Sequence, residues 1–349
     1  MDAFLKALPK CEHHLHLEGC LTPSLFFFLA AKNKIPLPDT PAYASPAALT
    51  QAYGHFTCLD DFLASYYRGM AVLVDTADFE ALAWSYFETA VSDGIVHAEV
   101  FFDPQSHTSR GVAFDTVVTG YERACRRAER ELGISTRLIM CFLRDHSVAS
   151  AEATMKEAIA RGYVDGDQES RIISGVGLDS CEIGYPAELF TKVYAEARQR
   201  GLWRTAHGGE EGGPEYIRGG LDALNCQRID HGIRLVEDPV LLQRVADERI
   251  LLTVCPLSNV CLRAVSQLED VPIQKFLQAG VRFSINSDDP AYFGGFLLKN
   301  YEAVQEAFGL SCKDWETIVV NSIEGSWISE ARKQQLLALV NECMDKYGF

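Results

Sequence analysis

The chain contains 349 residues, of which 48% are hydrophobic and 23% charged, a composition typical of a globular protein with a large core and not of a disordered one. Its 32 basic and 48 acidic side chains give a formal net charge of −16 at pH 7, which repels phosphate backbones and anionic lipid. This balance argues against a protein that binds nucleic acid or a membrane surface. We therefore expect a small-molecule ligand.

The amino-terminal segment does not resemble a secretory leader or a membrane span. Its longest apolar stretch covers only residues 25–31, well short of the roughly 20 residues that cross a bilayer. The acid at Asp2 does not fit a leader peptide either. Eleven cysteines without a C-x-x-C pair fit reduced thiols better than a disulfide framework or a thiolate zinc site. We predict a cytoplasmic protein and leave nuclear entry open.

Short apolar, β-branched runs recur along the chain, and each is followed by a stretch with helical signals, such as the spacing of Phe114, Val117 and Val118. Eight runs are predicted strands: residues 10–17, 96–102, 137–143, 172–179, 203–206, 228–231, 250–255 and 281–286. Eight β-α units predict a closed parallel α/β barrel. A doubly wound open sheet is the alternative, but the glycine-rich phosphate turn that it normally carries is missing.

Residues 20–95 lie between the first two predicted strands and carry helical stretches at 59–72 and 78–91. Residues 35–54 are rich in proline and read as an irregular excursion without being a domain boundary. We expect a single barrel domain over residues 1–349. Residues 20–95 would then be a helical insertion that forms a lid over one mouth of the barrel.

The first predicted strand carries a pair of histidines at alternate positions. Because side chains alternate along a strand, we expect His14 and His16 on one face together with Glu12 and Glu18, and His13 on the other. Two imidazoles on one face form a two-ligand metal site. Polar residues at a strand end are also often simply solvated, so this pair needs further ligands.

Further candidate ligands follow other strands. His207 and His231 fall at the carboxyl ends of predicted strands five and six, and Asp288 and Asp289 follow the eighth. Catalytic groups of such barrels gather at this face. The alternative for the paired acids is a turn or a helix cap. The remaining histidines lack a converging partner, and we expect surface or packing roles for His55, His97, His107 and His146.

Three neutral imidazoles and one carboxylate form a nitrogen and oxygen ligand set that suits zinc. Zinc lowers the pKa of a bound water from about 15.7 to about 7, so the set predicts a hydrolase. Residues 172–179 contain no lysine that could bridge two metals, and we expect one zinc ion per chain. A second zinc deaminase signature is rejected, because His97-Ala-Glu99 is not accompanied by C-x-x-C.

Five motifs resemble those of the adenosine/adenine deaminase family and stand in the family's order: His14-Leu-His16, His207-Gly-Gly-Glu210, Asp230-His231-Gly232, Cys255-Pro-Leu-Ser-Asn259 and Ser287-Asp-Asp-Pro290. Any one motif is weak, but together they span essentially the whole chain. The segments that begin at Leu8, Phe101 and Asn286 are more similar to fungal-type adenine deaminases than to adenosine deaminases. The resemblance implies a (β/α)8 TIM barrel of the metal-dependent hydrolase type.

The resemblance also implies a role for each motif residue. It makes His14, His16, His207 and Asp288 the zinc ligands. It makes Glu210 the proton donor to purine N1, His231 the group that orients and deprotonates the attacking water, and Asp289 a partner of that water and of purine N7. A neutral acid at N1 suits deamination, because it stabilises the tetrahedral centre that forms at C6. The alternative for Glu210 is a helix N-terminal carboxylate.

The activity implied by the resemblance is zinc-dependent hydrolysis of adenine to hypoxanthine and ammonia, in purine salvage. The alternatives are deamination of another 6-aminopurine, namely adenosine, a nucleotide or an N6-substituted adenine, and a barrel that binds purines without turnover. No lysine or arginine adjoins the motifs of strands one and eight, which argues against a nucleotide. The sequence leaves the oligomeric state open.

One position departs from the family pattern. Adenosine-type enzymes have a glycine after strand four whose backbone amide meets the purine, and a gapless comparison puts Glu182 there. We expect Ser180 or a nearby backbone group to replace the contact to purine N3. We also expect the bulk of Glu182 to occlude a ribose pocket and favour the free base.

Overall fold

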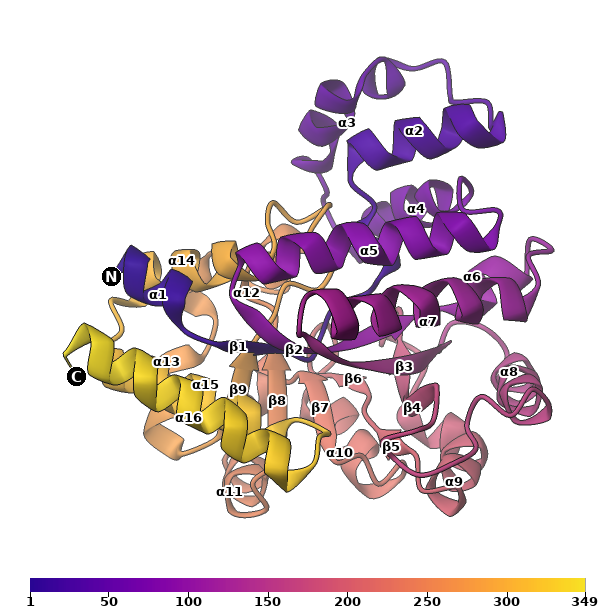
Figure 1. Ribbon diagram of the computed structural model, residues 1–349. Helices are drawn as coiled ribbons and strands as arrows, with labels where there is room; N and C mark the ends of the chain where they lie inside the picture. The colour runs from indigo at the N-terminus through magenta and orange to yellow at the C-terminus, as the bar shows by residue number, and fades with distance from the viewer. Residues whose placement is uncertain (349) are drawn as a thin grey trace.

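A computed structural model describes residues 1–348 as a barrel of parallel strands surrounded by helices (Figure 1). The strands are β1 Lys10–Glu12, β2 Ile95–Phe102, β3 Ser135–Leu143, β4 Ile173–Asp179, β5 Trp203–Arg204, β6 His207–Gly208, β7 Arg228–His231, β8 Leu251–Val254 and β9 Arg282–Ile285. They pair in parallel in the orders β1-β2-β3-β4-β5 and β6-β7-β8-β9. The predicted α/β barrel is confirmed, and the open doubly wound sheet is excluded.

The short strands β5 and β6 are the two parts of the fifth barrel strand. The Thr205 N–H donates to the carbonyl of Val176 in β4 at 3.0 Å. One residue later, the carbonyl of Ala206 accepts from the N–H of Asp230 in β7 at 2.9 Å. The chain thus pairs first with β4 and then with β7, and it joins the two sheets on this side of the barrel.

The barrel closes on the other side through the backbone of Asp288, which follows β9. Its N–H donates to the carbonyl of His14 at 3.0 Å, and its carbonyl accepts from the N–H of His16 at 3.0 Å. The Oδ1 atom of Asn286 accepts from the N–H of His13 at 2.8 Å. Residues beyond β1 therefore pair with residues beyond β9, at the mouth of the barrel.

The strand predicted over residues 10–17 is too long, and the expected alternation holds for His13, His14 and His16 but fails for Glu12 and Glu18. Regular pairing of β1 with β2 ends at Glu12. Glu12 accepts a hydrogen bond from the hydroxyl of Tyr86 at 2.7 Å, and Glu18 lies in a short 3-10 helix and accepts one from Tyr121 at 2.9 Å. Neither carboxylate joins the imidazoles of His14 and His16, because the chain leaves the extended conformation after Glu12.

The helices in the described part of the chain are α1 Asp2–Ala7, α2 Pro23–Asn33, α3 Pro46–Tyr53, α4 Leu59–Met70, α5 Thr76–Ser92, α6 Pro104–Thr108, α7 Phe114–Glu131, α8 Val148–Ala160, α9 Thr191–Gln199, α10 Pro214–Asp222, α11 Pro239–Asp247, α12 Pro256–Cys261, α13 Ile273–Ala279, α14 Leu297–Phe308, α15 Cys312–Gly325 and α16 Glu330–Tyr347. Several begin at a proline after a capping residue. The side chains of Thr22, Ser45 and Asp238 accept hydrogen bonds from backbone N–H groups at the starts of α2, α3 and α11.

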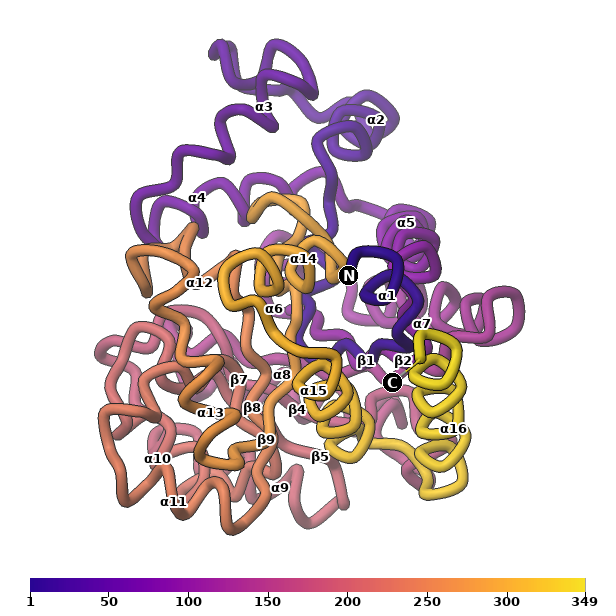
Figure 2. The backbone as a smooth tube through the Cα atoms, turned by 90° about the vertical axis from the view of Figure 1, so that its left-hand side faces the viewer, coloured from indigo at the N-terminus to yellow at the C-terminus, as the bar shows by residue number. Residues whose placement is uncertain are grey.

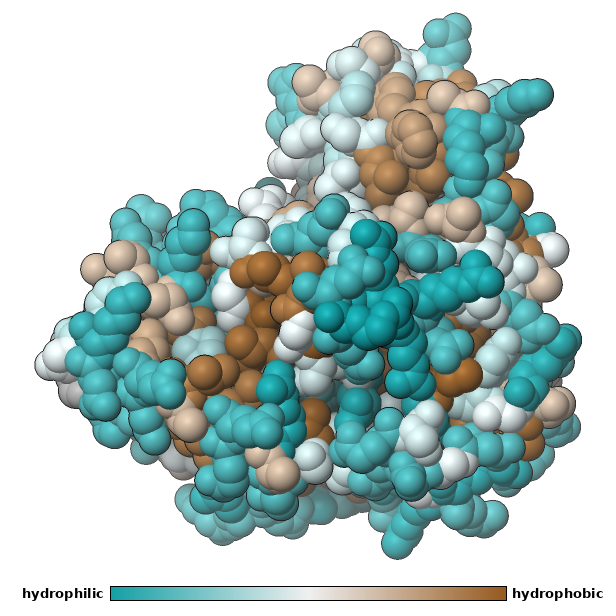
Figure 3. Space-filling view, viewed as in Figure 1, coloured by the Kyte–Doolittle hydropathy of each residue, from teal (hydrophilic) through white to brown (hydrophobic). Residues whose placement is uncertain are grey.

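Residues 20–95 form the helices α2 to α5. Figures 1 and 2 show α2 and α3 standing out from one end of the barrel, with α4 and α5 between them and the strands. In Figure 3, apolar residues gather over this projecting part and in a strip to the left of the centre, while the rest of the visible face is mostly hydrophilic. The insertion is helical as expected, and its role as a lid stays a prediction.

The two ends of the described chain lie side by side (Figures 1 and 2). The hydroxyl of Tyr347 in α16 donates to the carbonyl of Ala3 in α1 at 2.8 Å, and the Tyr347 ring meets that of Phe4 edge to face. All cysteines within residues 1–348 are free, and most are buried. Of the helices in this range, none has the length and apolarity that crossing a membrane requires.

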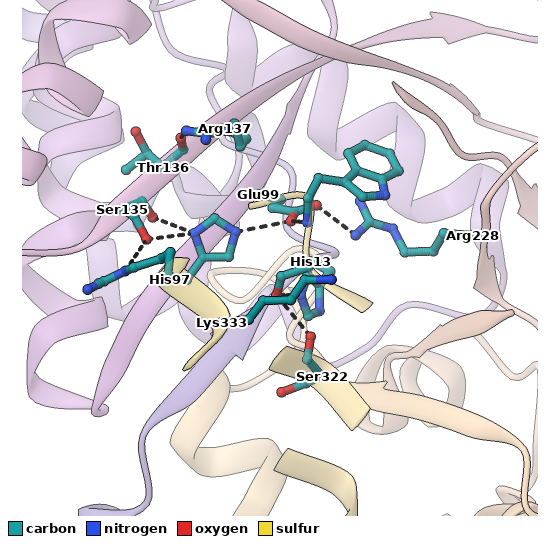
Figure 4. Close-up of polar contacts among 12 residues, drawn as sticks. His13, His97, Glu99, Ser135, Thr136, Arg137, Arg228, Ser322 and Lys333 are labelled. Carbon is teal, nitrogen blue, oxygen red and sulfur yellow. Dashed lines mark hydrogen bonds and ion pairs between the residues drawn. The ribbon is translucent and has the colours of Figure 1, made fainter. Parts of the chain in front are cut away.

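A buried polar cluster fills the amino-terminal end of the barrel interior (Figure 4). Glu99 of β2 pairs with Arg228 of β7 at 2.7 Å and with Nε2 of His97 at 3.0 Å. It also accepts from the N–H of Trp327, whose indole lies 3.9 Å from the Arg228 guanidinium and stacks on Trp203. Burial alone would raise the pKa of Glu99, but Arg228 holds it below its usual value. At the centre of the cluster, the ion pair between Glu99 and Arg228 connects β2 with β7 across the barrel.

We expect Glu99→Gln to lower the free energy of unfolding by about 3 kcal/mol, because it leaves the buried Arg228 charge unpaired. The matched control is Glu131→Gln, which removes an exposed pair with Arg127 and should cost less than about 1 kcal/mol. Urea unfolding followed by circular dichroism measures both. Equal costs for the two variants would contradict the structural role of the cluster.

Candidate active site

Four of the residues predicted as ligands meet at the carboxyl end of the barrel. One side-chain atom from each of His14, His16, His207 and Asp288 lies within 4.8 Å of the corresponding atoms of the other three, and all four residues are buried. The Oδ1 atom of Asp288 is 3.2 Å from Nε2 of His14 and 3.6 Å from Nε2 of His16. The ring of His207 lies 4.6 Å from that of His14, centroid to centroid.

The Nδ1 atom of each imidazole in this group faces a polar side chain. The Nδ1 of His14 lies 2.9 Å from the hydroxyl of Thr253. The Nδ1 of His16 lies 3.6 Å from Asp179, and that of His207 lies 3.4 Å from Asp230. Such outer partners orient the rings and leave the Nε2 atoms for another ligand.

The donor set fits a zinc ion. Three imidazole nitrogens and one carboxylate oxygen are the ligand types of catalytic zinc sites. The Nε2 of His14 is buried and has no hydrogen-bond partner among residues 1–348. A buried polar atom without a partner is costly, and a metal ion would satisfy it. The role of the four residues as ligands remains a prediction.

His231 and Glu210 lie next to this group. The Nε2 atom of His231 is 3.5 Å from the Glu210 carboxylate and 4.0 Å from that of Asp288. The amide of Asn259, at 3.2 Å from Nδ1 of His231, fixes the orientation of the ring. His231 and Asp288 both have positive φ angles, of 60° and 62°. Such left-handed backbone at non-glycine residues is strained and occurs often at functional sites.

The environment of Glu210 favours the neutral acid. Burial, followed by the nearby charges of Asp288, Glu182 and Glu211, raises the pKa of Glu210 well above its usual value. Its Oε1 atom is buried and has no hydrogen-bond partner in the described part of the protein. Burial also lowers the pKa of His231 well below that of a free imidazole, which keeps the ring neutral. The pair therefore combines a proton donor with a proton acceptor.

Asp289 reaches the site because residue 19 is a glycine. A Cβ atom at Gly19 would lie 2.0 Å from Oδ1 of Asp289 and 2.7 Å from its Cα, so any side chain at position 19 would displace the Asp289 backbone. The Oδ1 atom of Asp289 is buried and unpaired among residues 1–348. It is available to a bound ligand.

All of the proposed site residues except His14 line one pocket, which has an empty volume of about 420 Å³ including the solvent at its mouth. Helix α4 covers one wall with apolar and aromatic side chains: Leu59, Phe62, Leu63, Tyr66 and Tyr67. Ser180, Asp103 and Asp179 contribute polar groups. Within the described chain, the lining residues include neither lysine nor arginine.

Asp103 and Asp179 are site residues that the sequence did not single out. Burial, followed by the charge of Glu18, raises the pKa of Asp103 to about 7, although the interaction with Asp179 acts in the opposite direction. Its Oδ2 atom also accepts from the hydroxyl of Tyr66 at 3.4 Å. The position of Asp103 directly after a barrel strand was the available signal. Asp230 and Asn259 stand within quoted motifs, but only the fold reveals which imidazoles they hold.

The expectation for Glu182 is wrong. Its side chain does not line the pocket but points into the protein, where it is fully buried. Its two oxygens accept hydrogen bonds from backbone N–H groups of Gly209, Glu210 and Gly212. It cannot therefore occlude a ribose site. Ser180 does line the pocket, as its proposed contact to the purine requires.

The histidines expected outside the site are indeed outside it. His97 belongs to the cluster at the other end of the barrel, and His107 is buried against Glu18 at 2.8 Å. His55 is exposed and His146 half-buried. His13, expected on the opposite face from His14, contacts Ser284 and Ser326 in the barrel interior.

Residues 9–343 match the family model described as adenosine deaminase. The adenine deaminase of Schizosaccharomyces pombe is 56% identical over 345 residues, which cover 99% of this chain and 93% of that protein. The adenine deaminase of Aspergillus fumigatus is 56% identical over 347 residues and covers 99% of this chain and 97% of its own. The chain belongs to the adenosine deaminase family, as its motifs predicted.

Solved structures support the same conclusion. The crystal structure of adenine deaminase from Arthrobacter aurescens has a TM-score of 0.92 and 44% sequence identity, covering 97% of this chain and 99% of that chain. An amidohydrolase from Burkholderia ambifaria, with bound Zn, has a TM-score of 0.86 and 27% sequence identity. The match covers 99% of this chain and 94% of that chain. The barrel is therefore of the amidohydrolase type.

Proposed function

We propose that this protein hydrolyses adenine to hypoxanthine and ammonia with the help of one zinc ion. The observation that carries the proposal is the convergence of three imidazoles and Asp288 beside a neutral acid and a neutral base, all buried at one pocket. Metal-assisted hydrolysis needs this combination of a ligand set, a proton donor and a proton acceptor. A barrel that only binds purines has no need of the acid and base pair.

The free base is favoured over the other 6-aminopurines. Full-length relatives at 56% identity are named adenine deaminase. A nucleotide phosphate would need a cationic partner, and the pocket wall offers none among residues 1–348. The charge of −16 makes an anionic substrate still less favourable. Adenosine and N6-substituted adenines remain the alternatives that a substrate panel separates.

The zinc ligands we propose are His14, His16, His207 and Asp288. When bound, zinc supplies a hydroxide nucleophile at neutral pH, because it lowers the pKa of water from about 15.7 to about 7. The side chains of Thr253, Asp179 and Asp230 face the Nδ1 atoms of the three rings and so favour the orientation that directs their Nε2 atoms to one point.

The protein side chains move the protons of the reaction. His231 accepts a proton from the attacking water, whose oxygen bonds to C6 of adenine. Glu210 donates its proton to N1, so the ring does not carry negative charge while C6 is tetrahedral. Asp289, with its unpaired Oδ1, binds N7 and holds the ring in place. The C6–N bond then breaks, the amine leaves as ammonia with the proton held by His231, and the hydroxyl proton restores Glu210.

The proposal extends to the surroundings of the site. We propose that residues 20–95 act as a lid within a single barrel domain, because α4 supplies one wall of the pocket. Closure of such a wall would exclude bulk water from the protonated Glu210. We also propose a role in purine salvage, since the product hypoxanthine is a free purine base. The free cysteines favour a cytoplasmic location.

A substrate panel on the purified protein tests the proposed activity. We expect kcat/KM for adenine to exceed that for adenosine, adenosine monophosphate and N6-methyladenine by at least about 100-fold. Release of ammonia measures the first three reactions, and release of methylamine measures the reaction of N6-methyladenine. Chelation should abolish the activity, and added zinc should restore it. Metal analysis of the same sample should give one zinc per chain. A preference for adenosine would overturn the substrate assignment and leave the reaction class intact.

The variant Glu210→Gln should keep its zinc and lose about 10²- to 10⁴-fold in kcat, because an amide cannot deliver the N1 proton. The wild-type profile of kcat/KM should fall on the alkaline side, where the raised pKa of Glu210 lets the acid ionise. That alkaline limb should be missing from the residual activity of the variant. A variant with near wild-type turnover would remove Glu210 from the mechanism.

The two adjacent acids should separate into distinct roles. Asp288→Ala should weaken zinc retention by at least about 100-fold, because it removes a proposed ligand. Asp289→Ala should retain zinc and lose turnover, because its carboxyl group holds the purine. Competition with a zinc chelator measures the first effect and steady-state kinetics the second. The reverse pattern would mean that the two roles are exchanged.

A further inference from the structure

The loop that carries Glu210 has few means of holding its own shape. It runs from the end of β6 to the start of α10 at Pro214 and contains glycines at positions 208, 209, 212 and 213. Glycine costs the most conformational entropy on ordering, and Gly209 has a φ of 76°, where other residues are strained. Yet Glu210 needs a fixed position, because proton transfer requires the donor within hydrogen-bond reach of its target.

Glu182 supplies the anchor that the loop lacks. One of its oxygens accepts from the N–H of Glu210 at 3.1 Å, and the other from those of Gly209 and Gly212 at 3.3 Å and 2.7 Å. Hydrogen bonds from backbone N–H groups to a charged carboxylate are among the stronger ones in proteins. The single buried side chain of Glu182 thus binds the backbone of Glu210, of the residue before it and of Gly212 after it.

Arg144 acts on the same loop with the opposite charge. Its Nη1 atom donates to the carbonyl of His207 at 2.8 Å, and its Nε atom donates to that of Tyr185 at 2.9 Å. Burial raises the pKa of Glu182, and the charge of the Arg144 guanidinium is the largest effect that opposes this rise and favours the carboxylate. Arg144 therefore binds two backbone segments, the loop that follows β4 and the start of the Glu210 loop. Its charge also favours the Glu182 carboxylate, which binds the rest of the Glu210 loop.

We propose that Glu182 is a positioning residue for the reaction: it acts through Glu210, by fixing the loop of residues 208–213, and does not touch the substrate. The inference rests on the proposed function, in which Glu210 is the acid. Misplacing a reacting group by about 1 Å can cost about 100-fold in rate. Loss of the Glu182 carboxylate should therefore lower kcat while the zinc ligands and the pocket wall stay in place.

A double-mutant cycle tests this role. Glu182→Gln puts an amide N–H₂ where one of the accepting oxygens stood, and we expect kcat to fall about 10- to 100-fold with KM changed less than about threefold and zinc retained. In the Glu210→Gln background the same change should cost less than about threefold, because the group that it positions is already inactive. An equal loss in both backgrounds, or a loss of zinc, would overturn the proposal.

Hydrogen exchange provides a readout that does not depend on activity. We expect the amides of Gly209, Glu210 and Gly212 to exchange at least about tenfold faster in Glu182→Gln, with the barrel strands unchanged. Unchanged exchange would overturn the anchoring role. If the wild-type protein turns over none of the purines in the panel, the proposed function fails, while the exchange experiment still decides whether Glu182 holds the loop.

Two further variants serve as controls. Glu182→Asp keeps the charge beside Arg144 but withdraws the carboxylate by one methylene, so it should fold and show an intermediate loss; it takes the place of Glu182→Gln in the cycle if the latter does not fold. A Glu182→Asp variant with full activity and unchanged exchange would contradict the proposal. Glu215→Gln, on the exposed first turn of α10, makes the same chemical change near the loop and should be neutral.

Discussion

The two backbone hydrogen bonds of Asp288 are the constraint on which the site depends. They join the segment after β9 to the segment after β1 and thereby close the barrel. The same residues carry three of the four proposed ligands, so ring closure and ligand convergence are one event. The left-handed backbone of Asp288 turns its carboxylate inward while its N–H and carbonyl pair with His14 and His16. A displacement of either strand would separate ligands that lie more than 270 residues apart in the chain.

The two ends of the barrel treat their buried carboxylates in opposite ways. At the amino-terminal end, Glu99 has partners for both oxygens, and Arg228 lies against its carboxylate and an indole ring. At the carboxyl end, one oxygen of Glu210 and one of Asp289 are buried without a partner in the described residues. Satisfied groups stabilise and define the fold, whereas unsatisfied ones carry a desolvation cost that a ligand can relieve. The desolvation cost of unsatisfied buried carboxylates is therefore concentrated at the pocket.

Much of the fold follows from local patterns, because most barrel strands lie in runs rich in apolar residues and are buried on both sides. The predicted runs locate all eight barrel strands, and the motif residues at their ends converge because parallel strands end at one face. The failures have physical causes. Alternation misplaced Glu12 because the strand ends there. Glu182 was misassigned, and Arg144 overlooked, because their partners are backbone groups on other loops, which leave no trace in residue type or spacing.

The indole that fills the floor of the barrel has a consequence for the order in which the chain can assemble. Trp327 follows the last strand, which ends at Ile285, and it belongs to the segment between α15 and α16. A polypeptide leaving the ribosome thus holds all its strands before it possesses the residue that fills their interior. Until then the guanidinium of Arg228 has no aromatic surface to lie against, and the nascent barrel is hollow at its base. Closure of the base of the barrel therefore depends on a residue that is synthesised after the last strand.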